Sequence, residues 1–121
     1  MAITRRIKPA DAIGLRDKLR DAYTRKNNNE IITFVKDHLK EPKRNAYLAE
    51  AQASSGRTAV AVTTPCIVFL MFGRFDYPTT QQDGTVKWTE INSAGFGYEL
   101  DGGNEILLHM TTAVVILEAE I

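Results

Sequence analysis

The spacing of apolar residues changes near residue 55. Before that point apolar positions recur every three or four residues, as on one side of an α-helix; after it they alternate or run together, as in β-strands. The sequence therefore predicts an α+β fold, with two or three N-terminal helices packed on an antiparallel meander sheet of four or five strands. We expect a single domain over residues 1–121, with a helical basic part (1–55) and a strand-rich acidic part (56–121).

Three segments of the first part are predicted to be helical. Two apolar stripes have helical spacing: Ala12, Leu15, Leu19, Ala22 and Tyr23, then Ile31, Val35, His38 and Leu39. Between them, the asparagines at 27–29 can end the first helix and cap the second. Pro42 opens a third segment, in which the alanines and leucine of residues 46–51 favour helix.

Four segments of the second part are predicted to be strands: Thr58–Thr63, Cys66–Phe72, Thr85–Ile91 and Gly95–Tyr98. Cys66–Phe72 is apolar throughout, which is typical of a central strand covered on both faces. Residues 76–84 contain Pro78 and Asp83-Gly84 and predict a polar connection, and residues 101–104 predict a hairpin turn.

The C-terminal segment, residues 105–121, is too long for a typical single strand and carries apolar residues on both faces. Two interpretations are open. The segment is a bent strand that serves both ends of one sheet, or it lines or joins a subunit interface.

The charged residues are also divided between the predicted helical part and the predicted strand-rich part of the chain. Residues 1–57 hold 13 Lys and Arg against 7 Asp and Glu, whereas residues 58–121 hold 2 against 8, so a neutral total combines +6 with −6. Complementary surfaces steer association, so the division suggests head-to-tail self-assembly. The candidate interface residues are Arg16, Arg20, Lys43 and Arg44 on one side and Glu90, Asp101, Glu118 and Glu120 on the other.

Catalytic chemistry has few candidates. Cys66, His38 and His109 are the one thiol and the two imidazoles, and Cys66 begins the most apolar strand, where a thiol usually acts as a buried hydrophobe. Six acids could hold a cation or do acid–base work, although a solvated surface is the simpler interpretation: Asp76, Asp83, Glu90, Glu99, Asp101 and Glu105. We expect no catalytic residues, no metal site and no cofactor.

Nucleic acid is a further possible partner of the basic part. Its lysines and arginines could face phosphates, or they could be the solvated side of amphipathic helices: Arg5, Arg6, Lys8, Arg16, Lys18, Arg20, Arg25, Lys26, Lys36, Lys40, Lys43 and Arg44. A dedicated DNA-binding protein would usually be basic overall, whereas this chain is neutral.

The outline of the chain resembles small bacteriophage head–tail connector or tail-terminator subunits, which form rings. The resemblance lies in a charged helical start, a strand after Pro65 and a long β finish. It implies a non-enzymatic assembly subunit that forms a homo-oligomer, in the cytoplasm or a virion. No signal peptide or membrane-spanning segment is expected. The alternatives are an enzyme using acidic residues, or an inhibitor or adaptor that binds one host protein through Tyr77, Trp88, Phe96 and Tyr98.

Overall fold

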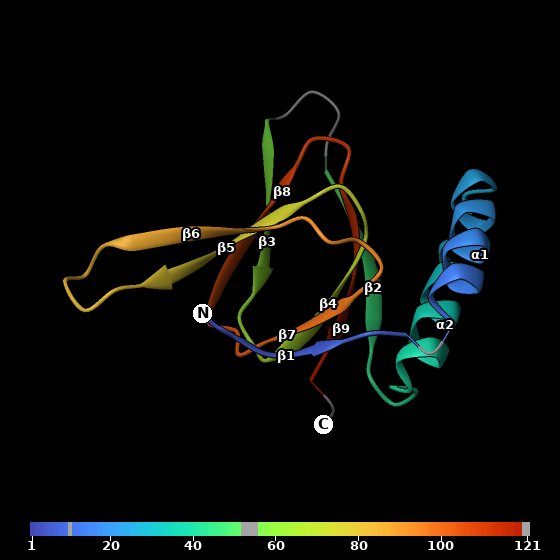
Figure 1. Cartoon of the computed structure of the whole chain (residues 1–121), viewed down its shortest axis with the longest axis horizontal. Coiled ribbons are helices and arrows are strands. Elements are labelled where there is room, and N and C mark those ends of the chain that lie inside the picture. The colour runs from blue at the N-terminus through green and yellow to red at the C-terminus, as the bar shows by residue number, and fades with distance from the viewer. Residues whose placement is uncertain (10, 52–55, 120–121) are drawn as a thin grey trace.

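The computed structural model describes residues 1–9, 11–51 and 56–119, in which the chain forms two helices and nine strands (Figure 1). The helices are α1 (Ala12–Thr24) and α2 (Asn28–Leu39). The strands are β1 (Ile3–Ile7), β2 (Ala46–Glu50), β3 (Arg57–Val62), β4 (Cys66–Phe72), β5 (Phe75–Thr80), β6 (Val86–Ile91), β7 (Gly97–Leu100), β8 (Asn104–His109) and β9 (Ala113–Glu118). One sheet has the order β1-β7-β4-β9-β2 and the other β3-β8-β5-β6, and every pairing is antiparallel.

The five-stranded sheet lies between the two helices and the four-stranded sheet (Figure 1). Successive side chains of β4 explain why: Ile67 and Phe69 join the buried cluster of the helices, whereas Val68 and Leu70 join the cluster between the sheets. The prediction that residues 66–72 form a central strand covered on both faces is therefore confirmed.

Both predicted N-terminal helices are present, and an asparagine caps the second as predicted, while Asp11 caps the first. The side chain of Asp11 accepts a hydrogen bond from the Gly14 amide (2.9 Å), and that of Asn27 accepts one from the Glu30 amide (3.2 Å). Each bond satisfies an amide that has no partner within its helix.

The predicted third helix is wrong. Residues 46–50 form β2, which pairs with β9 from Ala46 opposite Leu117 to Glu50 opposite Ala113. Helix propensity is a weak local preference, and pairing with an apolar neighbouring strand outweighs it here. Strand β1, which the sequence did not suggest, pairs with β7 on the opposite edge. The basic and acidic parts of the chain therefore share one sheet.

A single meander is also wrong, because the strands divide between two sheets. The predicted polar connection is largely strand β5, whose Pro78 lies opposite Trp88 of β6. A proline has no amide for a ladder, and the pairing of β5 with β8 stops at Asp76, two residues earlier.

The long C-terminal segment is two strands in different sheets. β8 lies in the four-stranded sheet and β9 in the five-stranded one, with a turn at residues 110–112 between them. In β9, Val114 and Ile116 face the inter-sheet cluster, while Val115 and Leu117 face the helices. Both apolar faces are therefore covered within one chain. The turn at residues 101–104 likewise joins β7 to β8 across the sheets rather than closing a hairpin.

Candidate functional site

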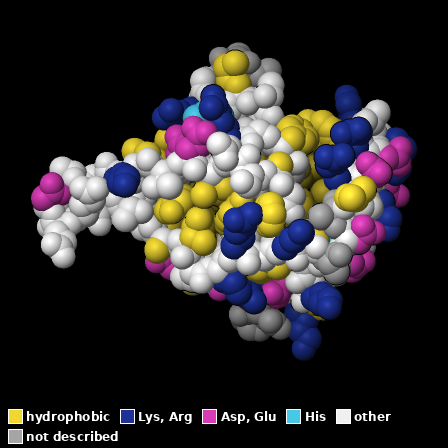
Figure 2. Space-filling view, viewed as in Figure 1, with side chains coloured by type: hydrophobic (Ala, Val, Ile, Leu, Met, Phe, Trp, Pro, Cys, Tyr) yellow, Lys and Arg dark blue, Asp and Glu magenta, His cyan; other side chains and the backbone are white. Residues whose placement is uncertain are grey.

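A two-stranded ribbon projects from the body of the molecule. β5 pairs with β6 along its whole length but with β8 only at Phe75 and Asp76. Residues 77–89, here called the hairpin arm, therefore leave the sheet and form a narrow extension (Figures 1 and 2). Near its root Thr79 donates a hydrogen bond to the Met1 carbonyl (3.0 Å). An isolated two-stranded hairpin is marginally stable in water, so the outer part of the arm gains from any surface that covers it.

The arm exposes apolar side chains on one face. Val86 is 49% exposed and Trp88 is 43% exposed, and both point to the same side of β6, as alternate residues of a strand do. Lys87 points to the opposite side. Glu90 continues the row of Val86 and Trp88 at the base of the arm, so this row is apolar with an acid at its end.

The tip of the arm carries a fixed carboxylate. Asp83 accepts hydrogen bonds from the Thr85 amide (3.0 Å) and the Thr85 hydroxyl (2.6 Å). These bonds favour the ionised form and lower the pKa of Asp83. The arm therefore ends in a negative charge at neutral pH.

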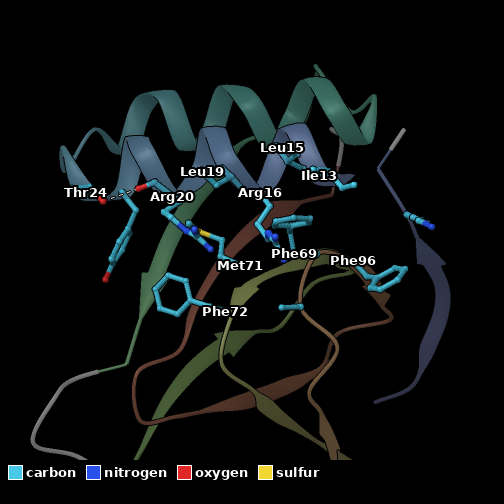
Figure 3. Close-up of a pocket in the computed structure, with 14 residues that line it drawn as sticks. Ile13, Leu15, Arg16, Leu19, Arg20, Thr24, Phe69, Met71, Phe72 and Phe96 are labelled. Atoms are coloured by element: carbon cyan, nitrogen blue, oxygen red, sulfur yellow. Dashed lines mark hydrogen bonds between the residues drawn. The ribbon is translucent and has the colours of Figure 1, made fainter. Parts of the chain in front are cut away.

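A second feature is a groove of about 660 Å³ between α1 and the five-stranded sheet, here called the α1 groove (Figure 3). Fourteen residues line it: Lys8, Ile13, Leu15, Arg16, Leu19, Arg20, Tyr23, Thr24, Phe69, Met71, Phe72, Ala94, Gly95 and Phe96. Its described lining includes three cations and no acid. Figure 3 shows Arg16 and Arg20 pointing from α1 toward Phe69 and Met71 of the sheet.

Two ring contacts lie at the ends of the α1 groove. The rings of Tyr23 and Phe72 meet edge to face with their centroids 5.1 Å apart. At the other end the Arg6 guanidinium lies 3.9 Å from the centroid of the Phe96 ring. The groove is thus an apolar surface bordered by cations, which fits a partner with apolar side chains next to carboxylates.

A cluster of charged side chains lies on the outer face of the four-stranded sheet. His109 Nε2 lies 2.9 Å from Asp76 Oδ1, Arg57 is 3.5 Å from Asp76, and Arg74 is 3.6 Å from Glu90. Figure 2 shows one histidine between acidic and basic side chains near the base of the arm. One ligand atom each from Asp76, Glu90 and His109 lie within 4.8 Å of one another, so these three could hold a cation. However, a guanidinium group already neutralises each carboxylate.

The thiol and the two imidazoles have separate environments. Cys66 is buried between the sheets, and burial raises the pKa of its thiol to about 11. His38 Nδ1 lies 2.7 Å from the Phe34 carbonyl oxygen on α2, and His109 contacts Asp76. A nucleophile needs a base within hydrogen-bonding distance, and the structure does not bring these residues together.

The basic candidates for the interface lie in two places. Arg16 and Arg20 are exposed on the wall of the α1 groove. Lys43 is exposed after α2, whereas Arg44 is largely enclosed, with Nε 3.0 Å from Glu41 and Nη1 donating to the Glu118 carbonyl (3.2 Å). Arg44 is therefore a structural residue of the subunit.

The acidic candidates for the interface are also partly engaged within the chain. Glu90 pairs with Arg74, and Asp101 accepts a hydrogen bond from the Ala2 amide (2.8 Å). Glu118 is exposed at the end of β9, and Glu120 lies outside the described residues. Of the described acids, Glu118 and Asp101 lie toward the same end of the five-stranded sheet, because Cys66 pairs with both Glu118 and Leu100, whereas Glu90 lies in the other sheet.

The aromatic candidates for partner binding differ in exposure. Trp88 is exposed on the arm, Tyr77 is half-buried at its root, and Phe96 is half-buried in the α1 groove. Tyr98 is only 4% exposed and its hydroxyl donates to the Ser93 carbonyl (2.8 Å), so it is a core residue rather than an anchor. The sequence placed Lys8 only among possible phosphate contacts and did not indicate Ile13 or Phe72 as site residues, because their proximity depends on how α1 crosses the sheet.

Comparisons with protein-family models, with curated proteins and with solved structures gave no match for this chain. Among the described residues, no helix is long and apolar enough to cross a membrane.

Proposed function

We propose that the protein is a non-enzymatic structural subunit that assembles head to tail with copies of itself. The observation that carries the proposal is the hairpin arm, a ribbon that leaves the sheet while exposing Val86 and Trp88. Exposed apolar ribbons are typical sites of strand pairing with, or docking on, another protein surface. Such a surface would remove the apolar face of the arm from water.

A head-to-tail contact joins unlike surfaces, so it closes into a ring or continues as a filament. The arm and the helices lie at opposite ends of the long axis of the molecule, so contact through the arm extends the assembly (Figure 1). We propose further that this assembly is part of a viral particle. That proposal rests on the resemblance in outline between this chain and the connector and tail-terminator subunits described above.

The test is the absolute mass in solution, measured by light scattering on a sizing column. We expect the wild-type protein to form a discrete oligomer and the double variant Val86→Thr with Trp88→Thr to be a monomer. Threonine keeps strand propensity, so circular dichroism and thermal unfolding should be nearly unchanged.

The matched control is Lys87→Thr, which changes the opposite side of the same strand and should leave the oligomer intact. A wild-type protein that is monomeric at every concentration would overturn the proposal. An oligomer that survives the double variant would do the same, because assembly would not depend on the arm. A monomer that captures one host protein would favour an inhibitor or adaptor instead.

A further inference from the structure

We infer that the α1 groove is the docking site for the hairpin arm of a second copy of this chain. The inference rests on the proposed function and names the surface that receives the arm. It pairs two features described above: a ribbon that exposes apolar side chains and a groove that is lined by apolar side chains and bordered by cations.

The apolar parts of the two surfaces have matching dimensions. Val86 and Trp88 are two residues apart on β6, which separates them by roughly 7 Å along the strand. On the groove side, the apolar lining residues Leu15 and Leu19 are one helical turn apart, about 6 Å along α1. Between this wall and the aromatic residues of the sheet lies the space of about 660 Å³ that the two side chains would enter.

The charges of the two surfaces are complementary. Lys8, Arg16 and Arg20 border the groove, and its described lining contains no acid. On the arm, Asp83 precedes the apolar pair along the chain and carries a negative charge at the tip, whereas Glu90 at the base is already paired with Arg74. Lys87 points to the other side of the strand and would face away from the cations. The ionised state of Asp83, which its hydrogen bonds from Thr85 favour, is the state that such a contact needs.

Within one chain the arm cannot reach the groove, because the two lie at opposite ends of the molecule (Figure 1). Each copy would therefore offer one arm and one groove, and each contact would leave a free arm at one end and a free groove at the other. Such a contact is heterologous, so further copies can be added through it until the first and last copies meet and a ring closes.

The test is a mixing experiment with two variants that fail in different ways. The arm variant, Val86→Thr with Trp88→Thr, keeps a complete groove. The groove variant, Arg16→Glu with Arg20→Glu, keeps a complete arm and changes exposed residues of α1. The control variant, Lys18→Glu with Lys26→Glu, makes the same change of charge at exposed positions outside the groove lining.

We expect the arm variant and the groove variant each to be monomeric alone and the control variant to assemble like the wild type. Mixed in equal amounts, the two monomeric variants should form a dimer of twice 13.5 kDa, because one intact arm meets one intact groove. Light scattering of each sample and of the mixture gives the masses, at a concentration at which the wild type is fully assembled.

Other results would overturn the inference. If the arm variant is monomeric but the groove variant still assembles, the arm docks elsewhere, and the proposed function survives while the α1 groove is excluded. If both variants are monomeric and the mixture contains no dimer, the two surfaces do not bind each other. If the control variant is also monomeric, general charge rather than the groove governs assembly.

Discussion

Gly97 shows how one missing side chain sets the distance between a helix and the sheet. A β-carbon at this position would lie 3.2 Å from Ile67 Cγ2 and 3.3 Å from Leu39 Cδ1, closer than side chains usually pack. Glycines alternate with aromatic residues at 95–98, and at Gly97 the end of α2 packs against the position that has no side chain.

Gly97→Ala should therefore destabilise the protein by about 1–3 kcal/mol, the usual cost of overpacking a closely packed site. The measurement is the free energy of unfolding from denaturant titration. Gly56→Ala is the matched control, because a β-carbon there has no neighbour within 4 Å among the residues that the structure describes. Equal free energies of unfolding for Gly97→Ala and the wild type would show that helix α2 shifts at no cost.

The charged cluster of Asp76, Glu90 and His109 leads to a prediction about metal ions. Because Arg57 and Arg74 already pair with its carboxylates, we expect Zn²⁺ to leave the midpoint of thermal unfolding unchanged. A bound ion that stabilises the fold by 1 kcal/mol would raise the midpoint by about 4–8 °C. A rise of that size, abolished by His109→Ala, would identify a cation site and revive the alternative of an enzyme using acidic residues.

At the scale of elements, Glu99 of β7 holds the first strand of the chain to the sheet. It lies 2.8 Å from Arg5 Nη2 and accepts a hydrogen bond from the Thr4 hydroxyl (3.1 Å), and Arg44 approaches within 4.0 Å. Burial alone would raise the pKa of Glu99, but the hydrogen bonds from Arg5 and Thr4 outweigh it, and the pKa is lowered. Arg5 and Arg44 belong to the basic part of the chain and Glu99 to the acidic part. Some of the opposite charges of the two parts therefore neutralise each other inside each subunit.

The pKa of Glu99 is lower in the folded protein than in the unfolded chain, and this fixes the sign of its effect on the free energy of unfolding as the pH changes. The stabilisation from Glu99 is present above the unfolded pKa of about 4.3 and is lost as the pH falls through the folded pKa. Glu99→Gln should lower the free energy of unfolding by about 1 kcal/mol at pH 7 and by less at acid pH. Denaturant titrations at both pH values, with the exposed Glu105→Gln as control, check this; a loss independent of pH would contradict it.

The elements that sequence periodicity predicted best are those whose pattern agrees with their tertiary setting. α1 and α2 have both an apolar stripe and a cap, and β4 is apolar on both sides because it is covered twice. β2 and β5 were missed because local preference and tertiary setting disagree: alanine favours helix at 46–51, and Pro78 suggests a loop. The α1 groove joins α1, β4 and residues 94–96, a proximity that no local pattern encodes.

For the whole molecule, the proposed docking of the arm in a cationic groove would make assembly sensitive to salt. We expect the oligomer mass to fall as ionic strength rises from about 0.05 M to about 0.5 M, because the screening length shortens well below its value of about 10 Å at 0.1 M. The subunit itself should keep its circular dichroism, since its core is apolar. Light scattering at each salt concentration measures the change, and a mass independent of salt would contradict a role for Lys8, Arg16 and Arg20.

The position of Pro78 has a consequence for the size of such an assembly. When each subunit is joined to the next by the same contact, the number of subunits in a closed ring follows from the angle between arm and groove. The ring of Pro78 fixes its own φ at the root of the arm, where the ribbon leaves the sheet. A fixed φ at this point restricts how the arm can tilt, so the backbone of each subunit, as well as the contact itself, would influence the number of copies.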